Sequence, residues 1–146
     1  SDISSSMVGE AERRYNELVA NGAKAPETTP KFDAMGLEEA SGKYDMVTCI
    51  DVMIHYPTKD MYGIVKHLGS LANDRIILSF APKNFFYDLL KKVGELFPGP
   101  SKTTRAYLHP EEDVRKALKE AGFSVKRTEM TSTNFYFSRL LEATRD

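Results

Sequence analysis

The sequence predicts an α/β fold, with a doubly wound, mostly parallel sheet that is closed by an antiparallel C-terminal hairpin. Segments typical of buried strands alternate with segments whose apolar residues recur at helical spacing. This alternation favours a parallel sheet covered by helices. The last two expected strands are joined by a short link, which only an antiparallel pair allows. The 146 residues are enough for one domain.

The first third of the chain predicts one helix and two strands. Residues 4–20 carry apolar side chains at helical spacing and are followed by Gly22, which favours a helix end. A short strand is expected over 31–35. Residues 44–50 are nearly all apolar or small, as in a strand buried between two helical layers.

The middle of the chain continues the alternation. Residues 60–72 predict a helix whose apolar side chains share one face, and 75–80 predict a second buried strand that ends before Pro82. Residues 86–97 again show helical spacing, with Asn84 as the expected cap.

The last third predicts a helix and the closing hairpin. Pro110 is suited to a helix start, and the acidic residues at 111–113 favour the positive end of the helix dipole. Gly122 suits the helix end. The strands of the hairpin are expected at 123–129 and 134–143.

Charge and cysteine content exclude several classes of protein. Lys and Arg number 20 and Asp and Glu 21, so the net charge is −1, which argues against a broad basic surface for nucleic acid. The single cysteine, Cys49, excludes an internal disulfide and a cysteine-rich zinc site. No metal site is expected.

Several stretches resemble one family of enzymes. They are Cys49–Pro57 (CIDVMIHYP), Ile77–Lys83 (ILSFAPK), Gly94–Lys102 (GELFPGPSK), Thr104–His109 (TRAYLH) and Phe135–Ala143 (FYFSRLLEA). In this order they resemble the magnesium-protoporphyrin IX O-methyltransferases, which are class I S-adenosylmethionine-dependent methyltransferases with a Rossmann-like fold.

The resemblance implies a reaction. Such enzymes transfer a methyl group from the cofactor S-adenosyl-L-methionine to one propionate carboxylate of magnesium-protoporphyrin IX, which gives the monomethyl ester in chlorophyll biosynthesis. Magnesium enters only as part of the substrate. Because a propionate is ionised near neutral pH, the enzyme needs mainly to align oxygen, methyl and sulfur and to exclude water.

Two acidic residues are candidates for the cofactor site. Asp2, next to Ile3, stands where the family places an acceptor for the ribose hydroxyls; its alternative role is a helix cap. Asp51, next to Val52, follows a buried strand, and ligands of open α/β sheets bind at the carboxyl ends of strands. We expect it to line the methionyl side, with a cap or turn residue as the alternative.

The adenine is expected at Met35, Gly36 and Leu37. Many members of the family carry an acidic residue at the position of Gly36, which would accept a hydrogen bond from the adenine amino group. This chain departs from that pattern. Backbone groups and apolar contacts from Met35 or Leu37 would then hold the ring.

His55 is the candidate catalytic residue, since it lies in the "IHYP" stretch four residues beyond Asp51. Its imidazole can hydrogen-bond a propionate or accept a proton, although a lone histidine is more often structural. Tyr56 would contact the substrate. We interpret His67 as a surface residue and His109 as a residue that only precedes a helix.

The wall of the substrate site is expected between Lys83 and His109. Aromatic side chains there offer flat surface to a macrocycle, and basic ones can meet a propionate. The alternative is a helix core beside a solvated basic loop. The candidate substrate-binding residues are Lys83, Phe86, Tyr87, Lys102 and Arg105.

The sequence shows no glycine-rich loop after a first strand, which class I methyltransferases use to hold the methionyl end of the cofactor. We therefore expect residues 1–146 to be the C-terminal two-thirds of a single methyltransferase domain, inactive alone. The family further implies contact with the large subunit of magnesium chelatase and peripheral membrane association through a missing N-terminal region.

The family also implies a location. We expect the chloroplast envelope or thylakoid, or a cyanobacterial thylakoid or cytoplasm for a prokaryotic protein. Two other readings stay open: a class I methyltransferase that acts on another small carboxylate or a phenol, and a non-catalytic α/β module that binds a protein partner.

Overall fold

The computed structural model describes residues 1–83, 107–132 and 137–146. The chain divides into two compact units, Ser1–Ser41 and Gly42–Asp146, which are described in turn. The expected helix at 86–97 lies outside the described residues.

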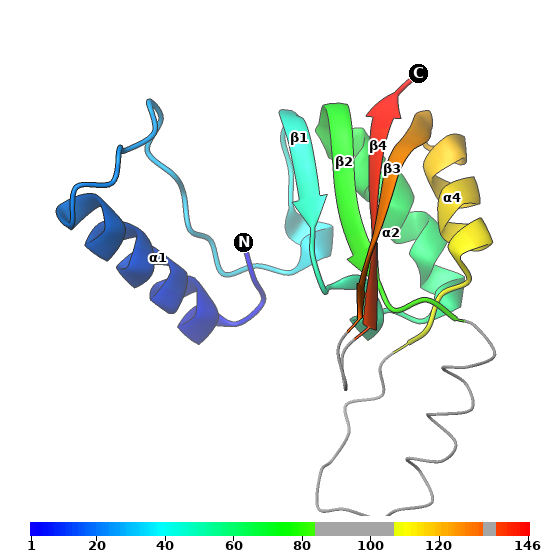
Figure 1. Cartoon of the computed structure of the whole chain (residues 1–146), viewed down its shortest axis with the longest axis horizontal. Helices are drawn as coiled ribbons and strands as arrows, with labels where there is room; N and C mark the ends of the chain where they lie inside the picture. Colours follow the sequence, from blue (N-terminus) through cyan, green and yellow to red (C-terminus); the bar gives the residue numbers. More distant parts are fainter. Residues whose placement is uncertain (84–106, 133–136) are drawn as a thin grey trace, which may run out of the picture. The chain divides into compact units, whose positions relative to one another are not determined.

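The first unit is built on helix α1 (Ser5–Ala20) (Figure 1). The Ser4 side chain caps it by accepting a hydrogen bond from the Met7 N–H, and Gly22, at φ 90°, follows its end. The helix predicted over 4–20 is confirmed. No α1 residue is buried.

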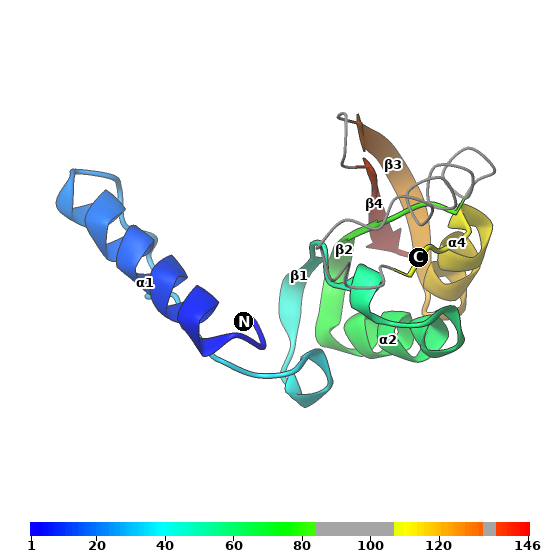
Figure 2. The same ribbon diagram turned by 90° about the horizontal axis from the view of Figure 1, so that it is seen from below.

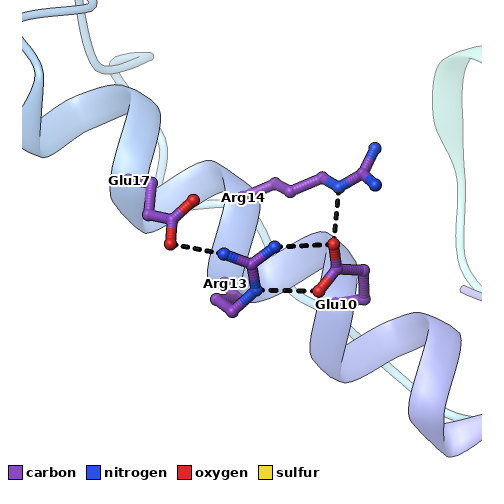
Figure 3. A network of polar contacts seen from close by, with 4 residues as sticks. All are labelled: Glu10, Arg13, Arg14 and Glu17. Carbon is purple, nitrogen blue, oxygen red and sulfur yellow. Dashed lines mark hydrogen bonds and ion pairs between the residues drawn. The ribbon is translucent and has the colours of Figure 1, made fainter.

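An ion-pair network runs along one side of α1 (Figure 3). Glu10 accepts from Arg13 and Arg14, each at 2.7 Å, and Arg13 also pairs with Glu17. The hydrogen bonds from the two guanidinium groups lower the pKa of Glu10 to about 2. The side chains of Arg13, Arg14 and Glu17 are more than half exposed and that of Glu10 is 36% exposed, so the network supports the helix locally and contributes little to the stability of the fold.

The strand predicted over 31–35 is wrong in extent. Only Ala34 forms a bridge, to Asp2, and the two short segments run parallel. A 3₁₀ turn at Leu37–Glu39 follows.

The second unit is a four-stranded sheet in the order β1-β2-β4-β3 (Figure 1). Its strands are β1 (Tyr44–Cys49), β2 (Ala72–Phe80), β3 (Phe123–Ser132) and β4 (Phe137–Arg145). β1 and β2 are parallel, whereas β4 is antiparallel to both β2 and β3. The parallel pair and the closing antiparallel hairpin are therefore confirmed, and the second strand of the hairpin inserts next to β2.

Two helices, α2 (Thr58–Leu71) and α4 (Glu111–Glu120), pack against each other on one face of this sheet (Figure 2). Both follow the predicted helices closely, and Gly122, at φ 84°, ends α4. The core lies between the helices and the sheet. Its largest apolar side chains with almost no exposed surface are Phe80, Phe123, Met53, Met61, Leu68, Ile76, Leu78, Leu118 and Leu141.

The burial of β1 differs from the prediction. Cys49 is buried and Val47 partly so, but Tyr44 and Met46 are 53% and 51% exposed. Successive strand residues alternate between the two faces of a sheet. β1 is an edge strand in this unit, whose described helices cover one face only, so one set of β1 side chains stays open.

No helix of the described residues is long and apolar enough to cross a membrane.

Candidate active site

The candidate residues of the second unit lie where β1 and β2 end. β1 stops at Cys49, and residues 51–56 form a loop that includes the 3₁₀ turn Met53–His55. β2 runs parallel to β1 and ends at Phe80. This is the edge at which open α/β sheets bind ligands.

Asp51 has a left-handed backbone conformation, which is uncommon outside glycine although aspartate tolerates it better than most residues. Its φ is 57°, and among the described residues it alone combines a positive φ with a side chain. Such a conformation costs of order 1–3 kcal/mol and persists where the surrounding structure enforces it. The expectation that Asp51 is placed at the end of a strand is met, while its contact with a cofactor remains a prediction.

Ser79 of β2 fixes this conformation. The Asp51 backbone N–H donates to Ser79 Oγ at 2.8 Å, and the Ser79 hydroxyl donates to Asp51 Oδ1 at 3.0 Å. Ser79 is only 3% exposed. Ser79 is not among the residues predicted from the sequence, because nothing in an apolar strand indicates that its serine has a partner 28 positions away.

The turn that carries His55 is anchored by Met53, its first residue. Met53 is fully buried, whereas His55 is exposed and Tyr56 is half-buried. The backbone N–H groups of His55 and Tyr56 donate to the carbonyls of Val52 (3.0 Å) and Met53 (3.2 Å). Met53 thus holds the turn in the core, while His55, two positions later, presents an imidazole to solvent.

His109 ties this turn to the core. It is fully buried, and its Nε2 lies 2.9 Å from the Met53 carbonyl oxygen. A carbonyl only accepts, so Nε2 carries the proton and the imidazole donates. Nδ1 is buried without a hydrogen-bond partner among the described residues. The interpretation of His109 as a residue that merely precedes a helix is therefore incomplete.

The backbone around His109 reinforces the link. The Tyr107 N–H donates to the Ile54 carbonyl at 2.8 Å. The His109 N–H donates to the Ala81 carbonyl, and the Lys83 N–H to the His109 carbonyl, both at 2.9 Å. The last residues of the expected substrate wall thus pair with the 3₁₀ turn after β1 and with the residues that follow β2. Lys83 itself is exposed.

The first unit brings another group of candidates together. The Met35 N–H donates to the Asp2 carbonyl at 3.0 Å, which places Asp2 beside Met35 and Gly36. The Asp2 carboxylate accepts the Ser4 N–H at 2.7 Å, but Ser4 itself is the N-cap of α1, so the alternative that Asp2 caps the helix is wrong. Asp2 is also exposed. Ile3 is 85% exposed.

Gly36 has an acidic neighbour. A Cβ atom built on Gly36 would lie 3.2 Å from Glu38 Oε2, so the Glu38 carboxylate reaches the space that a side chain at 36 would take. Leu37 begins the 3₁₀ turn that positions Glu38. Sequence analysis missed Glu38, because the register of a short turn is not visible in the sequence.

The remaining candidates lie outside the described residues: Phe86, Tyr87, Lys102 and Arg105. The described part of the chain contains no group of three His, Cys, Asp or Glu side chains that could hold a metal ion. Cys49 is a buried free thiol.

Comparison with known proteins identifies the family. A family model described as "Magnesium-protoporphyrin IX methyltransferase C-terminus" matches residues 49–145. The chloroplastic magnesium protoporphyrin IX methyltransferase of Arabidopsis thaliana is 54% identical over 98% of this chain and 44% of that protein. A magnesium-protoporphyrin O-methyltransferase of Synechocystis sp. is 55% identical over 99% of this chain and 61% of that protein.

A solved structure agrees over almost the whole chain. The magnesium protoporphyrin IX methyltransferase of Synechocystis PCC 6803 with bound SAH matches with a TM-score of 0.84 and 51% identity, over 99% of this chain and 62% of that one. The chain thus spans between 44% and 62% of the length of these three proteins. By the match to the family model and the identity to these relatives, the chain belongs to the magnesium-protoporphyrin IX methyltransferase family.

Proposed function

We propose that the protein transfers a methyl group from S-adenosylmethionine to a propionate carboxylate of magnesium-protoporphyrin IX. The observation that carries the proposal is the identity of 54% and 55% to two enzymes named for this substrate, across nearly the whole chain. The related structure with bound SAH supports the choice of cofactor.

The residues of the second unit suit such a cofactor. Bound S-adenosylmethionine supplies an electrophilic methyl group on a sulfonium centre. Asp51 offers a carboxylate at the carboxyl end of β1, in a conformation held by Ser79, and an anionic group there favours the cationic methionyl end of the cofactor. Val52 follows it in the same loop and would add backbone contacts.

His55 would act on the substrate rather than on the cofactor. Its exposed imidazole lies four residues beyond Asp51, on a turn anchored by Met53. The propionate is already anionic near neutral pH, so His55 would orient the carboxylate by a hydrogen bond and need not remove a proton. Tyr56 and Lys83 would extend the substrate contact.

Glu38 would replace the acidic side chain that position 36 lacks. Its carboxylate lies beside Gly36, and a carboxylate oxygen accepts a hydrogen bond from an amino group such as that of adenine. Asp2, Ile3, Met35 and Leu37 complete this part of the proposed cofactor site, with Asp2 as the acceptor for the ribose hydroxyls.

We also propose the extent of the domain, the residues that line the porphyrin, a partner and a location. Residues 1–146 would form the C-terminal two-thirds of one methyltransferase domain, and Phe86, Tyr87, Lys102 and Arg105 would line the porphyrin. The large subunit of magnesium chelatase would be a partner, and the enzyme would associate peripherally with chloroplast or cyanobacterial membranes. The chloroplastic name of the Arabidopsis relative supports the first location.

Product analysis tests the reaction. The complete encoded protein is incubated with S-adenosylmethionine and magnesium-protoporphyrin IX, and mass spectrometry should show a product heavier by CH2, because a methyl group replaces one acid hydrogen. Fragmentation should place that group on a propionate. Methylation of other small carboxylates or phenols, with none on the porphyrin, would instead favour another class I methyltransferase.

A substitution at His55 tests whether the module is catalytic. His55→Ala should reduce kcat by about tenfold to 100-fold, which corresponds to the loss of one orienting hydrogen bond to a charged group, while the circular dichroism spectrum stays unchanged. His67→Ala, on helix α2, is the control and should keep its turnover. Undiminished turnover in His55→Ala would remove the catalytic role.

A further inference from the structure

We propose that Ser79 is a positioning residue for the cofactor, and that it acts by locking the Asp51 carboxylate in its binding orientation. The inference rests on the proposed function, because it takes Asp51 as the residue that meets the methionyl end of S-adenosylmethionine. Nothing in the local sequence around Asp51 specifies this partner, which comes from the neighbouring strand.

The lock is reciprocal. Ser79 Oγ accepts the Asp51 backbone N–H at 2.8 Å and its hydroxyl proton is donated to Asp51 Oδ1 at 3.0 Å. A hydroxyl has one proton to donate and lone pairs to accept, so a single serine side chain serves both contacts. The first contact holds the main chain of Asp51, and the second holds its side chain.

The backbone of Asp51 needs such a lock. At φ 57° an aspartate sits in the left-handed region, which residues other than glycine adopt only when other contacts favour it. Relaxation to an ordinary φ would turn both the N–H and the carboxylate away from Ser79. The orientation of the carboxylate and the strained backbone are therefore set together.

Ser79 is well placed to impose this geometry, because it belongs to a central strand. β2 pairs with β1 on one side, where Leu78 faces Cys49, and with β4 on the other, where Ser79 faces Leu140. At 3% exposure, Ser79 has little access to water, which would otherwise compete for its hydroxyl. A functional side chain held by a rigid element is positioned more accurately than one held by its own loop.

A binding measurement tests the inference in the complete encoded protein. Ser79→Ala should raise the Kd for S-adenosylmethionine about tenfold and raise its KM similarly, with kcat and the KM for the porphyrin nearly unchanged. A serine that only stabilises the fold would lower Tm and leave the Kd as it is. Ser124→Ala is the matched control, since Ser124 also donates to an aspartate, Asp146, but at the start of β3.

A double-mutant cycle then shows whether Ser79 acts through Asp51. Asp51→Gly removes the carboxylate and accepts a positive φ without strain, and it should weaken binding at least as much as Ser79→Ala. Adding Ser79→Ala to Asp51→Gly should change the Kd no further. If the increase in Kd of the double variant were instead the product of the increases in the two single variants, the inference would be overturned. An unchanged Kd in Ser79→Ala alone would also overturn it.

The outcomes separate this inference from the proposed function. If the unmodified protein binds no S-adenosylmethionine, the proposed function fails. If it binds and methylates normally but Ser79→Ala binds equally well, only the positioning role fails. Should Ser79→Ala not fold, Ser79→Cys keeps nearly the same volume with a weaker donor, and the same increase in Kd is then required of it.

Discussion

At the scale of the residue, the first unit shows how an acidic group can be supplied from a neighbouring position. Gly36 lacks the side chain expected beside an adenine, yet its φ of −67° makes no use of glycine's freedom. The carboxylate of Glu38, two positions later, reaches the space that a side chain at position 36 would occupy. A carboxylate thus lies beside position 36 although the residue at 36 carries none.

Glu38 should therefore affect cofactor affinity. Glu38→Gln keeps the size of the side chain but replaces one carboxylate oxygen by an amide donor, and we expect the Kd for S-adenosylmethionine to rise about threefold to tenfold, in line with one lost hydrogen bond of about 1 kcal/mol. Isothermal titration calorimetry measures it. Glu39→Gln, in the same exposed turn, should bind normally; equal losses in both variants would indicate a general charge effect.

Cys49 illustrates a residue with reactive chemistry but a structural role. Burial raises the pKa of its thiol to about 11. The thiol is therefore neutral in the folded protein at pH 8, where the thiolate is the reactive form. Labelling with a thiol reagent at pH 8 should be slow in the folded protein and fast after unfolding in urea.

The same shift predicts a pH dependence of stability. The folded pKa is raised above the unfolded value, so the contribution to stability is present below about pH 9 and is lost as the pH rises toward 11. Urea unfolding at pH 7, 9 and 10.5 should show a smaller decline for Cys49→Ala than for the unmodified protein. Rapid labelling of the folded protein at pH 8 would contradict both expectations.

At the scale of the element, the 3₁₀ turn Met53–His55 depends on a segment far along the chain. A buried histidine donates to its first carbonyl, and Tyr107 donates to its second. Met53 has no exposed surface. The exposed His55 therefore belongs to a turn that is held by the burial of Met53 and by hydrogen bonds from His109 and Tyr107.

His109 should consequently matter for stability as well as for turnover. His109→Ala leaves a cavity and removes a donor to the Met53 carbonyl, and we expect it to lower the free energy of unfolding by about 2–4 kcal/mol. Urea denaturation measures the loss. His67→Ala should cost less than 1 kcal/mol, and a similar cost for both histidines would show that the buried link adds nothing.

At the scale of the whole molecule, the end of the chain is fastened to the junction of α2 and β2. Arg145 Nε donates to the Asn73 carbonyl at 2.7 Å, and its Nη2 donates to the carbonyls of Gly69, at 2.9 Å, and Ala72. Its guanidinium carbon lies 4.4 Å from the centroid of the Phe123 ring. One cation thus satisfies carbonyls at the end of α2 and joins three segments.

Removal of Arg145 should loosen this junction. Arg145→Ala should lower the free energy of unfolding by about 1–2 kcal/mol, because the side chain is exposed and part of each interaction is replaced by water. Thermal and urea unfolding measure the change. Arg127→Ala is the control, since Arg127 is exposed and its partner Glu129 lies 4.0 Å away; that variant should unfold like the unmodified protein.

The pattern of apolar and turn residues was sufficient to predict the order of the helices and strands that the structure describes. The helices predicted at 4–20 and 60–72 and the closing hairpin are confirmed, because helical spacing, turn residues and a short link are local properties. The burial of β1 was not predictable, since it depends on which strands pair with β1 and on which faces of the sheet are covered by helices. The same holds for the strand expected at 31–35, where the structure has one isolated bridge, between Asp2 and Ala34.

The sequence by itself determined the fold class, the family and the candidate side chains at the strand ends, since each depends on contiguous residues. The tertiary structure decided how two of these side chains are supported. Asp51 is locked by Ser79, 28 positions away, and the turn of His55 is held by His109, whose partner Met53 is 56 positions away. Contacts over such separations leave no periodic trace in a sequence, because they arise only when the fold brings distant segments to the same edge of the sheet.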